Sequence, residues 1–216
     1  MRAAKCALVL GLLLLWPVAD QTRAEVNFGL SIGDDGIKGF YLAIGEHYRV
    51  PEREVVVVRE RNIPDEELPV VFFLARETGV APETIVKLRL GGKSWMDITL
   101  QLGRAADVFY VPIVHDPGPP YGKAYGYYKK HDRHHWNEIR LADADIVNFV
   151  NLKFICERYS CPPDDVIKLR GKGRSFSTIN TEVKKNRDQG KKSSQKMVTG
   201  EKAKDNNQGK SKGKKK

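Results

Sequence analysis

Three histidines lie close together and are the residues of this sequence best suited by type to binding a metal ion. They are His131, His134 and His135, with His115 and Asp132 nearby. Imidazole nitrogens and carboxylate oxygens are common zinc ligands. The spacing matches no established zinc motif, and no cysteine belongs to the group. Two interpretations stay open, a site for zinc or copper and a solvated basic segment.

The sequence contains no arrangement typical of enzymatic catalysis. No serine lies in the Gly-x-Ser-x-Gly turn that exposes the nucleophile of many hydrolases. No pair of carboxylates lies in an apolar segment where general acid–base chemistry could be predicted. We therefore predict no catalytic residue and no cofactor, and we expect a protein that is not an enzyme.

Two cysteines could form a disulfide. Cys156 and Cys161 are the cysteines that remain once an N-terminal signal peptide is removed. In an oxidising compartment such a pair can form a disulfide. The alternative is two small buried apolar side chains, because a helical turn can hold them beyond the roughly 7 Å between Cα atoms that a disulfide tolerates.

The segment 111–137 is rich in Pro and Gly and carries four tyrosines, which are Tyr121, Tyr125, Tyr127 and Tyr128. A connection of this length is usually functional or lacks regular structure, so we expect a loop. Its tyrosines either contact a peptide or glycan, because they combine rigid area with a polar tip, or pack on the protein's own helices and hold the loop.

Three segments resemble one another without gaps, at residues 50–72, 80–102 and 161–183. Apolar side chains recur at matching positions, as at Val55, Ile85 and Val166. Units of this size bury an apolar face by stacking on their neighbours. The repeat therefore predicts an array of small helical units with one continuous core.

An arginine also recurs, as Arg59, Arg89 and Arg170. These side chains either face an anionic ligand along one side of the array or have a structural role. In the structural role each arginine ends a helix by bonding carbonyl oxygens, or pairs with an acid such as Glu67 or Asp97.

Each unit is predicted to be two short helices with a tight corner. Proline lies at the start, acids follow in the first turn, and Asn62, Gly92 or Gly173 lies at the end of the first helix. Ser94 and Asp97 are typical of a capping box. The run 55–58 has high β-propensity, but its equivalent 85–88 has a helical pattern, so we predict a helix. Helices are also expected at 65–78 and 143–159.

Residues 71–90 resemble the DNA-binding helix-turn-helix family, with Ala75 in the first helix, Gly79 at the turn and Ile85 in the second helix. The same spacing recurs twice, as Cys156, Ser160 and Val166 and as Thr99, Gly103 and Phe109. The resemblance implies tight αα corners, and in that family the second helix contacts DNA. Here that helix carries Glu83 or Asp164 and Asp165, which repel phosphate, so sequence-specific DNA binding is not expected.

Two features indicate export. Residues 50–54 and 92–98 look like stretches of secreted bacterial proteins of unknown function, a resemblance that spans 45–183 and implies no activity. In addition, residues 1–24 contain a short apolar run after basic residues and end in Thr22-Arg23-Ala24, a typical signal peptidase site. We expect a cleaved signal peptide and a mature chain, without a transmembrane segment, in the periplasm or outside the cell.

A β-hairpin is expected at 25–45. Apolar residues alternate from Val26 to Ile32, residues 34–36 are a turn signal, and 39–44 could return antiparallel. A lone hairpin is marginally stable in water, so this one should pack on the helices.

Charge is concentrated at the C-terminus. Residues 184–216 hold thirteen Lys and Arg against three acids, whereas residues 25–183 hold 21 basic and 23 acidic residues. Gly, Ser, Asn and Gln separate the lysines, so this tail is predicted to be disordered. It either keeps the protein soluble or binds anionic polymers, lipid headgroups or nucleic acid by counterion release.

These patterns predict a mainly α protein, in which an N-terminal β-hairpin packs on an array of helix-turn-helix units. Two units lie at 46–110 and the third at 138–183, followed by a disordered tail. The expected function is a non-enzymatic exported envelope protein, a binding or scaffolding module whose tail attaches it to anionic surface material and which could also bind a protein partner. The alternatives are a nucleic-acid-binding helix-turn-helix protein, a periplasmic metal-binding protein and an enzyme whose site the sequence does not reveal.

Overall fold

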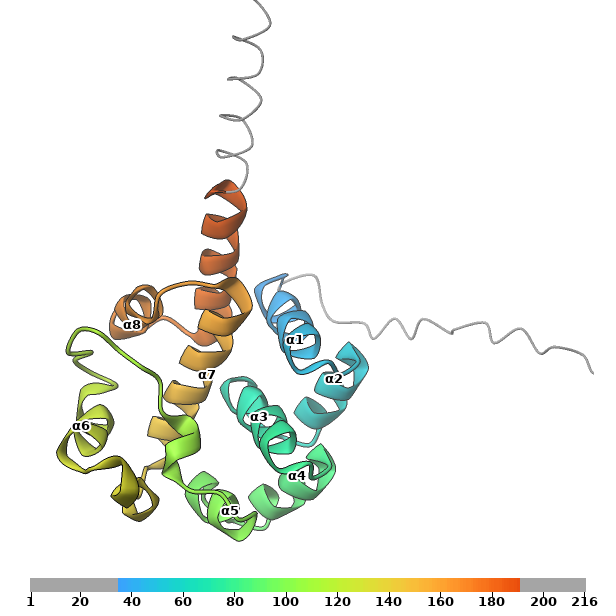
Figure 1. The fold of residues 1–216 in the computed structure, drawn as a ribbon. Coiled ribbons are helices and arrows are strands. Elements are labelled where there is room, and N and C mark those ends of the chain that lie inside the picture. The colour runs from blue at the N-terminus through green and yellow to red at the C-terminus, as the bar shows by residue number, and fades with distance from the viewer. Residues whose placement is uncertain (1–34, 191–216) are drawn as a thin grey trace, which may run out of the picture. The chain divides into compact units, whose positions relative to one another are not determined.

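The computed structural model describes residues 35–190, and every regular element in this range is helical (Figure 1). No helix of this range is both long enough and apolar enough to cross a membrane. The mainly helical class is therefore confirmed. The helices are α1 (Asp35–Tyr48), α2 (Glu52–Glu60), η1 (Asp65–Glu67), α3 (Leu68–Thr78), α4 (Pro82–Leu90), α5 (Trp95–Gln101), η2 (Ala106–Phe109), α6 (Gly122–Lys130), η3 (Arg133–Glu138), α7 (Asp143–Tyr159), α8 (Pro163–Gly171) and a C-terminal helix at residues 176–190.

The three repeats have the same backbone at their corners. A residue in the left-handed conformation ends each of α1, α3 and α7, and another lies just after each of α2, α4 and α8. After α1 and α7 the backbone N–H that follows this residue donates to a carbonyl five residues earlier, at 2.9 Å and 3.2 Å, as in a Schellman corner. The left-handed residues are Arg49, Gly79 and Ser160 in the first set and Asn62, Gly92 and Gly173 in the second.

The helix predicted over residues 55–58 is present as part of α2. Val55 and Val58 are buried, while Val57 is 46% exposed. Buried positions three residues apart lie on the same face of a helix. The packing of α2 against α1 and α3 outweighs the β-propensity of the valines. Ser94 caps α5 as expected, since its Oγ accepts the N–H of Asp97 at 3.1 Å.

Helix α7 lies at the centre of the described helices and packs against α1, α3, α5 and α8 (Figure 1). Its Phe149 and Phe154 are almost fully buried. The ring of Phe154 meets Phe40 of α1 edge-on at 5.9 Å between centroids and lies 6.0 Å from the ring of Tyr48. Aromatic burial of this kind joins the first and third repeats in one core.

The predicted β-hairpin at 25–45 is wrong where the structure describes it. Residues 39–44, the expected return strand, lie within α1. Phe40, Tyr41, Ile44 and Tyr48 recur at three- and four-residue spacing and are all buried, so they form one face of a helix against α3 and α7. The other expected strand lies outside the described residues.

The loop predicted at 111–137 is also wrong in part, because α6 and η3 lie inside it. Tyr121, Tyr125 and Tyr128 are separated by four and three residues and are at most 4% exposed. One side of α6 therefore buries three rings. That burial outweighs the poor helix propensity of Gly122 and Gly126.

The first residues of the predicted disordered tail, 184–190, are helical and extend the C-terminal helix. This helix is anchored by Phe176, Ile179 and Val183, which are buried. Adding a residue to a helix that has already formed costs less free energy than nucleating a new helix. Residues 191–216, like the predicted signal peptide at 1–24, lie outside the described residues.

The corner after α7 gives a prediction about stability. Ser160 has a φ of 54°, where a Cβ costs about 1–2 kcal/mol, partly offset by the roughly 0.5–1 kcal/mol of entropy that glycine loses. Ser160→Gly should therefore raise the free energy of unfolding by about 0.5–1 kcal/mol. In urea titrations the converse change, Gly79→Ser at the matching corner, should lower it by a similar amount. A loss of stability on Ser160→Gly would contradict the argument.

Candidate functional site

The three recurrent arginines converge on three consecutive acids, all in η1. Each arginine comes from a different repeat, and each takes a different acid. We call these six residues the arginine–acid hub. The pairs are Arg59 with Asp65, Arg170 with Glu66 and Arg89 with Glu67.

Arg89 has the most buried contacts of the hub, with 20% of its side chain exposed. Its Nη2 and Nε donate to Glu67 at 2.9 Å and 3.0 Å, and Nη1 donates to Asp143 at 2.5 Å. The guanidinium also lies over the Trp95 ring, 4.7 Å from its centroid. Burial opposes the charged form, but the hydrogen bonds with Glu67 and Asp143 outweigh it and raise the pKa of Arg89.

Arg170 makes equivalent contacts in the third repeat. It donates to both oxygens of Glu66, at 2.8 Å and 3.0 Å, and its guanidinium lies 4.3 Å from the centroid of Phe176. Both Arg89 and Arg170 also donate to the carbonyl of the residue four positions later, at 3.1 Å and 3.0 Å. The repeat therefore extends to individual hydrogen bonds.

The first repeat differs from the other two, because Arg59 makes one hydrogen bond to its acid where Arg89 and Arg170 each make two. Asp65 occupies the position that Trp95 and Phe176 hold in the other repeats, and Arg59 Nε lies 2.5 Å from its carboxylate instead of over a ring. Tyr41 donates to the same oxygen at 2.7 Å. The bond with Asp65 raises the pKa of Arg59. All three arginines are occupied by acids of the protein itself, which favours the structural interpretation over a row of ligand-binding arginines.

The four tyrosines of the 111–137 segment do not form an exposed contact surface. Tyr125 donates to the carbonyl of Ile113 at 2.9 Å and Tyr128 to that of Ala106 at 2.7 Å, and both are buried, as is Tyr121. Only Tyr127 among the four is partly exposed. These rings hold the segment on the helical core, as the second interpretation of the sequence proposed.

The histidines are not brought together as a metal site. Across residues 35–190 there is no group of three His, Cys, Asp or Glu side chains that could hold a metal ion. His131, His134 and His135 are exposed, and His131 Nδ1 lies 2.8 Å from the carbonyl oxygen of Tyr127. His115 lies 3.0 Å from Asp164 of α8 instead. The described geometry thus fits a solvated basic segment.

Cys156 and Cys161 lie side by side at the corner between α7 and α8. The N–H of Cys161 donates to the carbonyl of Cys156 at 3.2 Å, and side chains at these two positions of a Schellman corner commonly touch. Both are free thiols, half-buried, in this structure. The Cys161 thiol donates to the carbonyl of Ile155 at 3.8 Å. The neighbouring thiol, and then burial, raise the pKa of Cys156, whereas the neighbouring thiol lowers the pKa of Cys161. The disulfide stays a prediction.

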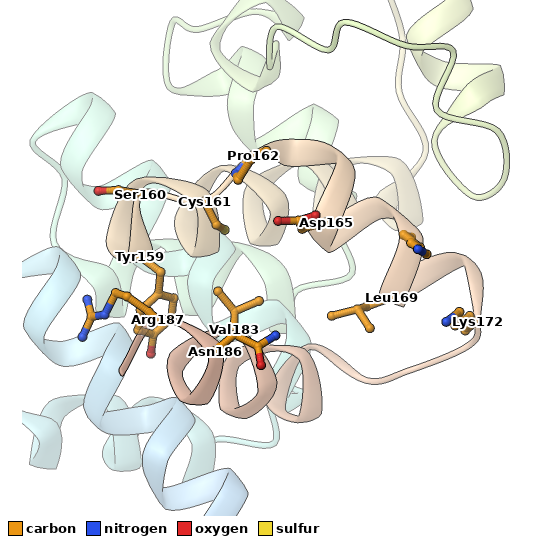
Figure 2. Close-up of a pocket in the computed structure, with 11 residues that line it drawn as sticks. Tyr159, Ser160, Cys161, Pro162, Asp165, Leu169, Lys172, Val183, Asn186 and Arg187 are labelled. Carbon is orange, nitrogen blue, oxygen red and sulfur yellow. The ribbon is translucent and has the colours of Figure 1, made fainter. Parts of the chain in front are cut away.

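A pocket of about 470 Å³ opens beside this corner, between α8 and the C-terminal helix (Figure 2). Tyr159, Ser160 and Cys161 line one end, and Figure 2 shows Cys161 and Asp165 on the side opposite Val183 and Asn186. Three cationic side chains, Lys168, Lys172 and Arg187, also line it, against one carboxylate, that of Asp165.

Sequence reasoning named Glu67 as a possible arginine partner but missed Asp65 and Glu66, and it also missed the basic lining of this pocket. The acids had a signal, since 65–67 are three consecutive carboxylates beside a helix start, equal in number to the recurrent arginines. Lys168 and Lys172 are four residues apart on α8 and so share a face, but Arg187 comes from an element predicted to be disordered. Only the packing of the C-terminal helix on α8 brings the three together.

Comparison with known proteins adds no relationship to this geometry. No family model matches the chain, and no curated protein or solved structure matches it.

Proposed function

We propose that this chain is a non-enzymatic, exported binding or scaffolding module, in which a helical body carries a polycationic C-terminal segment that attaches it to anionic polymers of the cell surface. The observation that carries the proposal is the separation of charge. Residues 184–216 have thirteen basic and three acidic residues, whereas residues 25–183 have slightly more acids than bases. Long-range attraction to polyanions therefore belongs to the C-terminal segment.

The arginine–acid hub supports the same assignment. Arg59, Arg89 and Arg170 are the basic residues that recur with the repeat, and all three are engaged by carboxylates. A phosphate or sulfate group would have to displace these intramolecular bonds. Lys184 and Lys185, in contrast, are exposed on the C-terminal helix, just ahead of the remaining lysines.

The test is a salt titration of binding to duplex DNA of mixed sequence, used as a model polyanion. Changing the ten lysines in 191–216 to glutamine leaves residues 35–190 intact. For the unaltered chain we expect log affinity to fall with log salt by about 0.9 for each phosphate neutralised, so that six or more contacts cost about a thousandfold between 50 and 200 mM salt. The glutamine variant should lose nearly all binding.

A matched control changes exposed lysines of the body, Lys93, Lys123 and Lys130, to glutamine. This variant should keep the slope of the unaltered chain. Thermal melts of all three proteins should coincide, because the altered segment has almost no apolar side chains to contribute to the core. Equal binding by the chain without the ten lysines would refute the proposal and move the polyanion site to the body.

A further inference from the structure

The pocket beside α8 presents one thiol of the cysteine pair. Cys161 is among its lining residues, and Cys156 is not. Cys156 belongs to the last turn of α7 and does not line the pocket. A reagent bound in the pocket therefore meets the thiol of Cys161.

The pair is also arranged so that the accessible sulfur is the better nucleophile. The thiolate is the reactive form of cysteine. The neighbouring Cys161 thiol, and then burial, raise the pKa of Cys156, whereas the neighbouring Cys156 thiol lowers the pKa of Cys161. The same contact leaves the second thiol next to the first, as an intramolecular displacement requires.

The charges around the pocket select the reagent. Lys168 and Lys172 are exposed, and among the described residues neither forms an ion pair with a carboxylate. Arg187 lies over the Tyr159 ring, 5.0 Å from its centroid, and its Nη2 lies 3.5 Å from the carboxylate of Asp188, so Lys168 and Lys172 are the unpaired cations of the lining. With Asp165 as the single acid in the lining, the pocket attracts small anions.

We propose that Cys156 and Cys161 form a redox-active dithiol that exchanges with small anionic disulfides bound between α8 and the C-terminal helix. The Cys161 thiolate attacks one sulfur of the ligand disulfide, whose S–S bond breaks, and the departing thiolate takes up a proton. The Cys156 thiol then loses its proton and attacks the Cys161 sulfur, releasing the second half of the ligand as a thiol. The protein loses two electrons and two protons, and the ligand disulfide gains them.

The geometry of the corner allows the bond that closes this cycle. The hydrogen bond from the Cys161 N–H to the Cys156 carbonyl, 3.2 Å long, fixes the backbones of the two residues around Ser160. Closing the disulfide joins side chains at two positions of a Schellman corner that are commonly in contact. The pocket keeps its basic lining, because Lys168, Lys172 and Arg187 lie on α8 and the C-terminal helix and not on the corner.

The experiment follows mixed-disulfide formation by intact mass, starting from the reduced full chain. Oxidised glutathione serves as the anionic disulfide and cystamine as a cationic one. The unaltered chain should end as the internal disulfide with oxidised glutathione. Cys156→Ser should accumulate the mixed disulfide at Cys161, and Cys161→Ser should react at least about tenfold more slowly.

A charge variant separates the pocket from general thiol reactivity. Lys168→Gln with Lys172→Gln should slow the reaction with oxidised glutathione by about tenfold and leave the cystamine reaction unchanged or faster. Lys93→Gln with Lys123→Gln, both far from the pocket lining, is the matched control and should change neither rate. Equal rates for Cys161→Ser and the unaltered chain, a mixed disulfide that persists in the unaltered chain, or the same slowing with both reagents would overturn the proposal.

Discussion

Arg89→Met should lower the free energy of unfolding by about 3 kcal/mol. Methionine keeps the length and most of the apolar contact of the side chain but leaves Glu67 and Asp143 without their cationic partner. Glu67 is 16% exposed, so its unpaired charge is poorly solvated, and removing one member of a largely buried pair typically costs about 3–5 kcal/mol. The value expected here is at the lower end, because Asp143 is 34% exposed. Urea denaturation followed by circular dichroism measures it.

The control is Arg61→Met. Arg61 pairs with Glu83 at 3.9 Å, and both side chains are more than half exposed. An exposed pair of this kind contributes roughly 0–1 kcal/mol, so this variant should stay within about 0.5 kcal/mol of the unaltered chain. If the two arginine variants lose equal stability, the hub is not the structural element that its geometry indicates. Adding Glu67→Gln to Arg89→Met should recover part of the loss, since the uncompensated charge is then removed.

Stability should also fall with acidification through His47. Its ring packs edge-on against Tyr48 at 4.6 Å and against Phe154 at 5.2 Å, and Arg76 Nη1 donates to its Nε2 at 3.2 Å. Burial, and then the charge of Arg76, lower the pKa of His47 from 6.5 to about 4. Glu157 lies 3.5 Å from the same nitrogen. Because Arg76 is the donor, Nε2 accepts the hydrogen bond and carries no proton, as in the neutral ring.

The sign follows from the two pKa values. Because the folded state holds the proton less tightly than the unfolded state, the unfolded state binds more protons below pH 6.5. The contribution of His47 is therefore complete at pH 7 and is lost as the pH falls from about 6.5 to about 4. It amounts to about 2 kcal/mol once partial solvation of the ring is allowed for.

The measurement compares the unaltered chain with His47→Gln in urea titrations at pH 7, 5.5 and 4. Glutamine keeps a polar group near Arg76 but does not titrate. Carboxylates that become protonated affect both proteins equally, so the difference between the two isolates His47. We expect the unaltered chain to lose about 2 kcal/mol more than the variant between pH 7 and pH 4. Parallel curves would show that the ring is solvated enough to protonate in the folded protein.

The sequence predicted the helices and their corners best where a local signal agreed with the repeat. The residues after the first helix of each unit, Asn62, Gly92 and Gly173, all have a left-handed backbone, as the helix-stop pattern predicted. Residues 55–58 show why the repeat mattered. Their β-propensity alone gives a strand, and only comparison with 85–88 gives the helix that is observed.

Two predictions, the β-hairpin at 25–45 and the loop at 111–137, were wrong because they followed local propensity instead of the repeat or the spacing of apolar residues. Helices had been expected before the second and third units, so the repeat implied one before the first, where α1 lies. The alternation of apolar residues upstream favoured a hairpin instead. In segment 111–137, the Gly and Pro content led to a predicted loop. The four- and three-residue spacing of Tyr121, Tyr125 and Tyr128 indicates a helix instead, and burial of these three rings stabilises it.

The candidate sites depend on contacts that no local pattern contains. Glu66 and Arg170 are 104 residues apart in sequence, and the pocket beside Cys161 needs the C-terminal helix to pack on α8. Propensity and periodicity describe which face of an element is buried, but not which element covers it. Of the two acids predicted as arginine partners, Glu67 pairs with Arg89, whereas Asp97 accepts a hydrogen bond from Ser94.

The hub has a consequence for how this protein can vary in length. In an open stack each unit touches only its neighbours, so copies can be gained or lost one at a time. Here three adjacent carboxylates of the first copy hold one guanidinium from every copy. Deleting the second or third copy leaves Glu67 or Glu66 without its arginine, and deleting the first removes the acids of both other arginines. A fourth copy would bring a guanidinium with no acid in η1 to receive it. Gain or loss of one copy should therefore cost stability, whereas an insertion should be tolerated at Val114, which is 89% exposed in the connection between η2 and α6.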